Sequence, residues 1–386
     1  MRILYVITDL GTGGAEMMLL KLLSATARNF DSAVVSLGGE GKIGPQISRL
    51  GVPVFSLGLR TAVPSPLRIL SLRSIVRKFH PSLVAGWMYH GNIMATLARR
   101  WAPRRPPLVW NIRQSLYDLG YERRRTAAII RLGARLSRHP AAIVYNSNIS
   151  VQQHEACGYS AEHRVVIPNG FDCQTFKPDP AARQSVRKEL GLDANALLVG
   201  LVARYHPMKD HAGFLKAAGC VAQRHPDIYF LLAGAGVTPE QMALKQIIST
   251  EQLQGRIFLL GERSDLPRLT ASFDVACSAS AWGEGFSNAI GEAMASGVPC
   301  VVTNIGDSAL LVGNAGVSVQ PENPQAMTEA ICSLIQSGEE HRKKLGTEAR
   351  QRIQHDYSIH FVARRFEDLY RSLAEPPISA RGRSTT

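Results

Sequence analysis

Short apolar runs recur along the first half of the chain, and segments with a helical spacing of apolar residues lie between them. Runs that are apolar throughout are typical of strands buried on both faces of a parallel sheet. The expected strands are 3–8, 33–37, 52–57, 83–86, 108–112, 142–145 and 165–167, and the clearest helices between them are 17–23, 71–79 and 92–100. This alternation predicts a doubly wound parallel α/β domain.

The same alternation begins again after a turn-rich joint, Ile167–Asp172 followed by Pro178-Asp179-Pro180. The expected strands of this second half are 197–203, 228–233, 257–260, 275–278, 298–302 and 316–319, with helices at 210–224, 239–252, 324–336 and 339–355. A chain of 386 residues is long enough for two or three domains. The predicted fold class is therefore α/β with two Rossmann-like domains, followed by a helix over 361–373 and a disordered tail over 375–386.

The stretch from Glu284 to Pro299 carries the most informative chemistry. A loop with one carboxylate, Glu284, leads into a short helix with a second, Glu292, on its second turn. The backbone N–H groups of 285–288 would be the unpaired donors of the helix start, with Ser287 or Asn288 able to cap it, and such an end attracts phosphate. The two carboxylates suit the hydroxyl groups of sugars. The alternative is an ordinary helix start with acidic residues near its positive end.

Two further loops follow predicted strands of the second half. Arg204 and Lys209 lie five residues apart after the strand 197–203, where they could clamp a diphosphate. Gly261, Glu262 and Arg263 follow the strand 257–260, where exposed backbone groups could pair with the edge of a base.

In the first half, a glycine-rich loop at 11–14 joins the first strand to a helix and predicts a ligand-approach loop. A nicotinamide or flavin site is the alternative, but Glu16 occupies the position of the third glycine of that fingerprint and no ribose-binding acid follows the next strand. His90 and Arg113 each follow a predicted strand and are candidate polar groups of a site, although His90 could equally be a histidine of a surface loop.

The formal net charge is +13 and the pI is about 9.7, which predicts attraction to phosphate-bearing partners or an anionic membrane face. The stretch 97–138 holds eleven Lys or Arg residues against two acids. A helix over 123–138 with a cationic face could rest on lipid headgroups, or it could be a solvated face over its own core. No nucleic-acid motif accompanies the charge, so nucleic acid is not an expected partner.

Six scattered cysteines without a C-x-x-C pair predict reduced thiols in a cytoplasm. The first residues lack a signal h-region, and no stretch reaches the length of a membrane-spanning helix. We therefore expect a cytoplasmic protein whose contact with the inner face of the membrane, if it has one, is peripheral.

Together these motifs resemble the GT-B retaining glycosyltransferases of family 4, also called glycosyl transferases group 1. The resemblance covers residues 1–373 and rests on the loop Gly13–Glu16, the segment Ile167–Asp172, the Arg204/Lys209 pair, and Glu284 with Glu292 as the E-x7-E motif. It implies an acceptor domain over 1–168, a nucleotide-sugar domain over 169–356 across a cleft from it, and a helix over 357–374 that returns to the first domain.

The resemblance also implies roles for residues. Glu284 would bind the hydroxyls of the donor sugar, Glu292 the ribose, and Arg204 with Lys209 the diphosphate. The implied catalytic set is Glu284, Arg204, Lys209, His90 and Arg113. The implied nucleotide-sugar-binding set is Gly13, Gly14, Asn169, Arg204, Lys209, Gly261, Glu262, Arg263, Glu284, Gly285, Phe286, Ser287, Asn288 and Glu292. Many relatives place a histidine near the donor sugar where this chain has Arg113.

The implied reaction is retaining transfer of a sugar from a UDP- or GDP-linked donor to a glycan or polyprenyl-diphosphate-linked acceptor in the synthesis of cell-surface polysaccharide or lipopolysaccharide. No Asp-x-Asp occurs in the chain, so we expect neither a metal nor a cofactor. A GT-B sugar-nucleotide epimerase and a non-catalytic nucleotide-sugar-binding protein are the alternatives.

Overall fold

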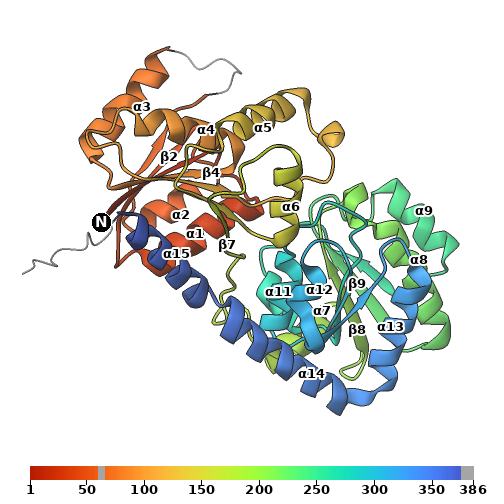
Figure 1. Cartoon of the computed structure of the whole chain (residues 1–386). Coiled ribbons are helices and arrows are strands. Elements are labelled where there is room, and N and C mark those ends of the chain that lie inside the picture. Colours follow the sequence, from red (N-terminus) through yellow and green to blue (C-terminus); the bar gives the residue numbers. More distant parts are fainter. Residues whose placement is uncertain (60–65, 375–386) are drawn as a thin grey trace, which may run out of the picture. The chain divides into compact units, whose positions relative to one another are not determined.

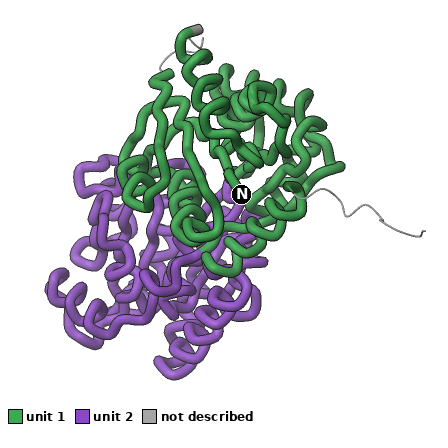
Figure 2. The backbone as a smooth tube through the Cα atoms, turned by 90° about the vertical axis from the view of Figure 1, so that its left-hand side faces the viewer, with its two compact units in different colours: residues 1–170, 359–386 green, residues 171–358 purple. Residues whose placement is uncertain are grey.

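A computed structural model describes residues 1–59 and 66–374, and the tail expected to be disordered, 375–386, lies outside them. The chain divides into two compact units (Figure 2). Unit 1 comprises Met1–Gly170 and the chain from Ile359 onward, and unit 2 comprises Phe171–Ser358. The unit boundaries thus fall two residues beyond the expected positions, after 170 instead of 168 and after 358 instead of 356.

Unit 1 is built on a parallel sheet of seven strands in the order β3-β2-β1-β4-β5-β6-β7. Figure 1 labels β2, β4 and β7 of this sheet. The strands are β1 (Arg2–Ile7), β2 (Asp31–Ser36), β3 (Val54–Ser56), β4 (Leu83–Trp87), β5 (Leu108–Ile112), β6 (Ala142–Tyr145) and β7 (Arg164–Val166). One face packs on α1 (Gly14–Thr26), α2 (Gly44–Arg49) and α15 (Ile359–Ala374). The other face packs on α3 (Pro66–Phe79), α4 (Met88–Arg99), α5 (Arg124–Leu136) and α6 (Asn148–Ala156), and a 3-10 turn η1 (Leu119–Tyr121) precedes α5.

Unit 2 has a parallel sheet of six strands in the order β10-β9-β8-β11-β12-β13. The strands are β8 (Leu197–Val202), β9 (Ile228–Ala233), β10 (Ile257–Leu259), β11 (Val275–Ser278), β12 (Cys300–Thr303) and β13 (Gly316–Val319). One face packs on α7 (Pro180–Glu189), α10 (Leu266–Ala271), α11 (Asn288–Ala295), α12 (Ser308–Val312) and α14 (Gly338–Arg352). The other packs on α8 (His211–Arg224), α9 (Met242–Thr250) and α13 (Pro324–Gln336). Short turns complete the unit: η2 (Pro207–Lys209), η3 (Gly313–Ala315) and the π-helical η4 (Ile353–Tyr357).

The predicted architecture of two doubly wound Rossmann-like domains is confirmed, because both sheets are wholly parallel and covered by helices on both faces. The strand order reverses between β1 and β4 in unit 1 and between β8 and β11 in unit 2. At such a switch point two neighbouring loops diverge to opposite faces of the sheet and leave a crevice at the carboxyl ends of the strands. The fold therefore places one candidate site in each unit.

The last helix, α15, supplies part of the core of unit 1. Phe366 and Tyr370 are fully buried in the core that β1, β4 and α1 form on this face of the sheet. The Phe366 ring stacks on Trp87 at a centroid distance of 6.2 Å, and Tyr370 lies 6.5 Å from Tyr5. The amphipathic spacing of Val362, Phe366 and Tyr370 explains why this segment forms a helix with one buried face.

Candidate active site

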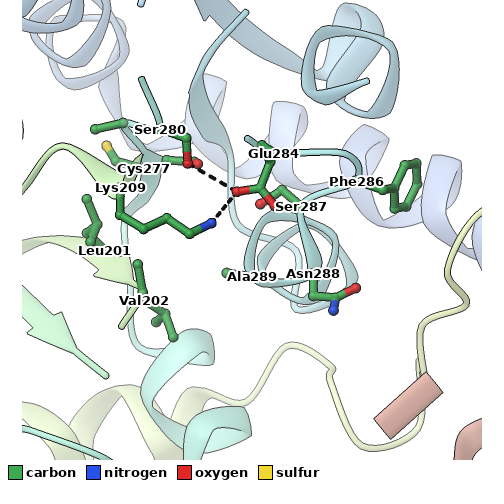
Figure 3. Close-up of a pocket in the computed structure, with 13 residues that line it drawn as sticks. Leu201, Val202, Lys209, Cys277, Ser280, Glu284, Phe286, Ser287, Asn288 and Ala289 are labelled. Atoms are coloured by element: carbon green, nitrogen blue, oxygen red, sulfur yellow. Dashed lines mark hydrogen bonds and ion pairs between the residues drawn. The ribbon is translucent and has the colours of Figure 1, made fainter. Parts of the chain in front are cut away.

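A cavity of about 210 Å³ opens at the switch point of unit 2. It is lined by the end of β8, the end of β11 and the beginning of α11, together with Lys209 and Glu284 from the loops between them (Figure 3). The lining residues are Leu201, Val202, Ala203, Lys209, Cys277, Ser278, Ala279, Ser280, Glu284, Phe286, Ser287, Asn288 and Ala289. Five of the residues that the sequence placed at a donor site therefore lie around one cavity: Lys209, Glu284, Phe286, Ser287 and Asn288.

Glu284 is the centre of the polar groups in this cavity. Its Oε2 accepts a hydrogen bond from Ser280 Oγ at 3.1 Å and forms an ion pair with the ammonium of Lys209. Figure 3 shows both side chains directed at the carboxylate. The Glu284 side chain is 12% exposed and that of Lys209 is 20% exposed. The pair is thus largely withdrawn from water. Charge-assisted hydrogen bonds are stronger in such a buried environment than in water.

Local backbone geometry fixes the position of Lys209. The residue ends the η2 turn, and Asp210 after it adopts a left-handed conformation with φ of 42°. The Asp210 carboxylate then caps α8 by accepting the Gly213 N–H at 2.9 Å. This sharp change of direction between a turn and a helix aims Lys209 into the cavity. Arg204, in contrast, is exposed and does not line the cavity; its Nη2 lies 3.9 Å from Met208 Sδ.

The start of α11 forms the wall opposite Lys209. Ser287 is the N-cap residue, but its side chain makes no capping hydrogen bond, contrary to the expectation that it or Asn288 would cap the helix. The first N–H groups of an α-helix have no partner within the helix itself, and a helix start of this kind attracts anions. Phe286 turns away from the cavity and stacks on Phe171, with centroids 6.0 Å apart. The ring of Phe171 packs directly against Gly291 of α11, where a larger residue would collide with it.

The other sequence-predicted residues of unit 2 lie outside the cavity lining. Glu292 is half-buried on the second turn of α11. Gly261 has φ of 65°; its N–H donates to the Val237 carbonyl, and its carbonyl accepts the Gly234 N–H. Glu262 is exposed. Arg263 forms hydrogen bonds of 2.8 and 2.9 Å to Asp265, and the Asp265 carboxylate raises its pKa.

In unit 1, Gly13 and Gly14 are exposed at the N-terminus of α1, where Gly13 is the N-cap residue. A Cβ at Gly13 would lie 2.4 Å from Oε2 of Glu16, so the glycine leaves room for that carboxylate. Burial raises the pKa of Glu16, a backbone hydrogen bond opposes this, and Asp9 adds to it. This loop follows β1, at the carboxyl edge of the sheet in unit 1.

From the sequence we expected His90 in a loop after a strand, but it lies on the first turn of α4. The helix begins at Met88 instead of the expected residue 92, because Met88 takes a left-handed φ of 63° directly after β4. His90 is partly buried, and burial lowers its pKa.

Arg113 is turned into the interior of unit 1. Its Nη1 donates to the Ile167 carbonyl at 2.7 Å and reaches Asn169 Oδ1 at 3.5 Å. The guanidinium lies 5.2 Å from the centroid of Trp87 and 5.1 Å from that of Phe366. Burial lowers its pKa to about 9. The structure therefore brings Arg113 and Asn169 together with α15.

Sequence reasoning did not identify Ser280, which holds the Glu284 carboxylate. The side chain is 1% exposed, and its backbone carbonyl accepts a hydrogen bond from Thr303 Oγ1 at 2.7 Å. A polar residue four positions before Glu284, directly after a buried strand, was the available signal. Among the described residues there is no cluster of three or more His, Cys, Asp or Glu side chains suited to a metal ion, and no helix is long and apolar enough to cross a membrane.

Two family models match the chain. The model described as Glycosyltransferase Family 4 matches residues 12–175, and the model described as Glycosyl transferases group 1 matches residues 196–337. Together they cover most of both units.

Among curated relatives, the chain is 36% identical over 152 residues to the UDP-Gal:alpha-D-GlcNAc-diphosphoundecaprenol alpha-1,3-galactosyltransferase of Escherichia coli, a match that covers 39% of this chain and 38% of the relative. It is 28% identical over 219 residues to the lipopolysaccharide core biosynthesis mannosyltransferase LpsB of Rhizobium meliloti, which covers 54% of this chain and 61% of the relative. The matches thus span less than two thirds of either relative.

Among solved structures, the fold is similar to that of HepE from Anabaena in complex with UDP, with a TM-score of 0.84. The two sequences are 23% identical, and the match covers 97% of this chain and 100% of that chain. The two family models, the relatives and the shared architecture agree: the chain belongs to the glycosyltransferases of group 1, family 4.

Proposed function

We propose that the cavity of unit 2 binds a nucleotide-sugar and that the protein transfers the sugar, with retention and without a metal ion, to a glycan or polyprenyl-diphosphate-linked glycan. The observation that carries this proposal is Glu284, a carboxylate held by Lys209 and Ser280 beside the start of α11. It combines an acceptor for sugar hydroxyls, a cation and a helix N-terminus in about 210 Å³.

The geometry supports a division of labour within the cavity. The diphosphate would approach the N–H groups at the start of α11 and the ammonium of Lys209, which then exchanges the Glu284 carboxylate for phosphate oxygens. Arg204, exposed on the same loop, would add a second cation once a donor is bound. Glu284, released from Lys209 but still held by Ser280, would accept hydrogen bonds from the sugar. Glu292, further along α11, would serve the ribose.

The proposed reaction is a same-face displacement. The bond between the anomeric carbon and the diphosphate oxygen breaks, the acceptor oxygen bonds to the same face of that carbon, and the acceptor proton passes to the departing phosphate. Lys209 and the amide dipoles of α11 stabilise the negative charge that develops on the leaving group. A glycosyl ester trapped on Glu284 would instead indicate a double displacement.

We favour a UDP-sugar as the donor and a diphosphate-linked lipid as the acceptor, because the name of the Escherichia coli relative gives that pair of substrates. A membrane-bound acceptor would also suit the cationic residues before and within α5. Charge reversal at Arg123, Arg124 and Arg125 should then weaken binding to anionic liposomes, most strongly at low salt. Liposome binding that stays unchanged would remove the membrane contact from the proposal.

The deciding experiment is a thermal-shift panel of UDP-, GDP- and ADP-sugars. A donor at one hundred times its Kd stabilises the native state by about 2.7 kcal/mol. We expect one nucleotide class to raise the unfolding midpoint of the wild type and of Glu348→Ala, an exposed control in the same unit, but not of Glu292→Ala. No shift with any nucleotide-sugar would refute donor binding.

Product analysis then tests the chemistry. Transfer to a lipid-linked acceptor should proceed in the presence of EDTA, and NMR of the product should show the anomeric configuration of the donor. A donor sugar that changes configuration at a ring carbon without being transferred would identify an epimerase. Binding without turnover, together with unchanged cellular glycan after Glu284→Gln, would identify a non-catalytic binding protein.

A further inference from the structure

Three exposed arginines lie at the carboxyl-terminal end of α5: Arg131 and Arg135 on the helix and Arg138 in the turn after it. No ion pair or hydrogen bond joins their side chains to any residue in 1–59 or 66–374. Some surface arginines do have an acidic partner: Arg2, for example, pairs with Asp31 at 3.2 Å. The three guanidinium groups are therefore available to an anion from outside the chain.

These side chains surround a cavity of about 440 Å³ between the carboxyl ends of α5 and α6. Its remaining lining residues are Ala134, Cys157 and Gly158. Two carboxylates near this end of the unit already have partners. Glu155 accepts two hydrogen bonds of 3.1 Å from Arg164. Asp118, whose negative charge adds to burial in raising the pKa of Cys157, accepts the Gly120 N–H at 2.7 Å. The groove is thus positively charged and large enough for a phosphate group.

The stability of α5 itself does not account for this charge. Arg131 and Arg135, four residues apart on the helix, repel each other. The helix also begins with Arg123, Arg124 and Arg125 and has no acid in its first turn, although its N-terminus is the positive end of the dipole. An anionic partner along the helix would relieve both costs.

Exposed apolar side chains on α5 and on the segment before it indicate the kind of anion. Leu132 on α5 is 39% exposed, and Tyr117 and Tyr121, which precede the helix, are 60% and 73% exposed. The two tyrosine rings lie 6.2 Å apart. Arginine beside tyrosine and leucine is the combination found at the interface of a bilayer, where rings and aliphatic groups enter the headgroup region. A free phosphate ion would leave these groups in water.

We propose that Arg131, Arg135 and Arg138 form a groove that binds the phosphate of an anionic membrane lipid, with Leu132, Tyr117 and Tyr121 entering the bilayer interface. The groove belongs to unit 1, whereas the donor cavity belongs to unit 2, so this assignment stands or falls independently of glycosyl transfer. It replaces diffuse attraction between a basic protein and a membrane by a defined site for the headgroup.

The test is co-sedimentation of the full chain with phosphatidylcholine vesicles, prepared with or without phosphatidylglycerol. The groove variant is Arg131→Gln/Arg135→Gln/Arg138→Gln. The matched control, Arg28→Gln/Lys42→Gln/Arg49→Gln, removes the same charge from exposed positions around α1 and α2, on the opposite face of the sheet. Inorganic pyrophosphate, added in calorimetry without vesicles, tests a free phosphate as the ligand.

We expect the wild type and the control to bind only vesicles that contain phosphatidylglycerol, and the groove variant to bind them on the order of a hundredfold more weakly. The thermal midpoint of the groove variant should stay the same or rise, since repulsion along α5 is removed. Equal loss in both variants would show diffuse attraction and overturn the groove. So would the absence of vesicle binding by the wild type, or tight binding of pyrophosphate by a protein that ignores vesicles.

Discussion

The substitution Asp274→Ala tests whether the stability of unit 2 depends on a buried ion pair. Asp274 lies directly before β11, the strand that leads to Ser280 and Glu284. Its carboxylate accepts hydrogen bonds from Arg183 Nη1 at 2.6 Å, Arg187 Nη2 at 2.7 Å and the Leu198 N–H at 2.8 Å. The Arg187 side chain is 1% exposed.

Removing the carboxylate would leave the Arg187 charge buried, with only the carbonyls of Ala196, Ser272 and Arg183 as partners. Breaking a buried pair from one side costs about 3–5 kcal/mol. At about 2–4 °C per kcal/mol for a unit of this size, the melting midpoint of unit 2 should fall by roughly 6–20 °C.

The matched control is Asp31→Ala, which breaks the pair with Arg2 on the surface of unit 1. Both side chains are more than half exposed, so the loss should stay below about 1 kcal/mol. Differential scanning calorimetry and urea unfolding measure both variants. The double variant Arg187→Met/Asp274→Ala should recover part of the stability, because no unpaired charge remains buried at position 187. A loss for Asp274→Ala no larger than that for Asp31→Ala would refute the reasoning.

Three further predictions concern single side chains. In Gly291→Ala a Cβ would lie 1.9 Å from Cζ of Phe171, so urea unfolding should show a loss of about 1–3 kcal/mol instead of the usual gain for alanine in a helix; a gain would contradict the packing described. Burial lowers the pKa of His154 from 6.5 to about 4, so its contribution to stability is complete above pH 6.5 and is lost as pH falls toward 4. Unfolding at pH 5 should therefore cost about 2 kcal/mol less than at pH 7.5 in the wild type, and the pH dependence should be smaller in His154→Phe. Ser280→Ala should weaken donor binding about tenfold in calorimetry, because the Glu284 carboxylate loses the hydroxyl group that holds it. Ser280→Thr keeps a hydroxyl group and is the control. Equal affinity in the wild type and Ser280→Ala would disprove this positioning role.

The strands could be predicted from the sequence because each contains a short apolar run, and several bounds, such as those of β5, β9 and β11, agree to the residue. The shorter helices α2, α6, α7, α10 and α12 could not be singled out, since five to ten residues carry too little periodicity. The early start of α4 depends on the left-handed conformation of Met88, which no local pattern announces.

The site was predictable where its residues follow one another in the chain, as from Glu284 to Asn288. Tertiary packing decided the rest. The spacing of Arg204 and Lys209 suggested an equivalent pair, but the turn at Asp210 directs only Lys209 into the cavity. The environment of Arg113 is formed by Phe366, some 250 residues further along the chain, so its burial could not be inferred from its neighbours in sequence.

The place of α15 in the core of unit 1 has a consequence for synthesis on the ribosome. Unit 2 is continuous in sequence and can close its core before the last helix has been translated. Unit 1 cannot complete its core at that stage, because Trp87 and Tyr5 remain uncovered until Phe366 and Tyr370 have been synthesised. The usual order, in which the N-terminal domain folds first, is thus reversed at its final step. A chain released early, before position 359, would expose this apolar face and be a substrate for chaperones.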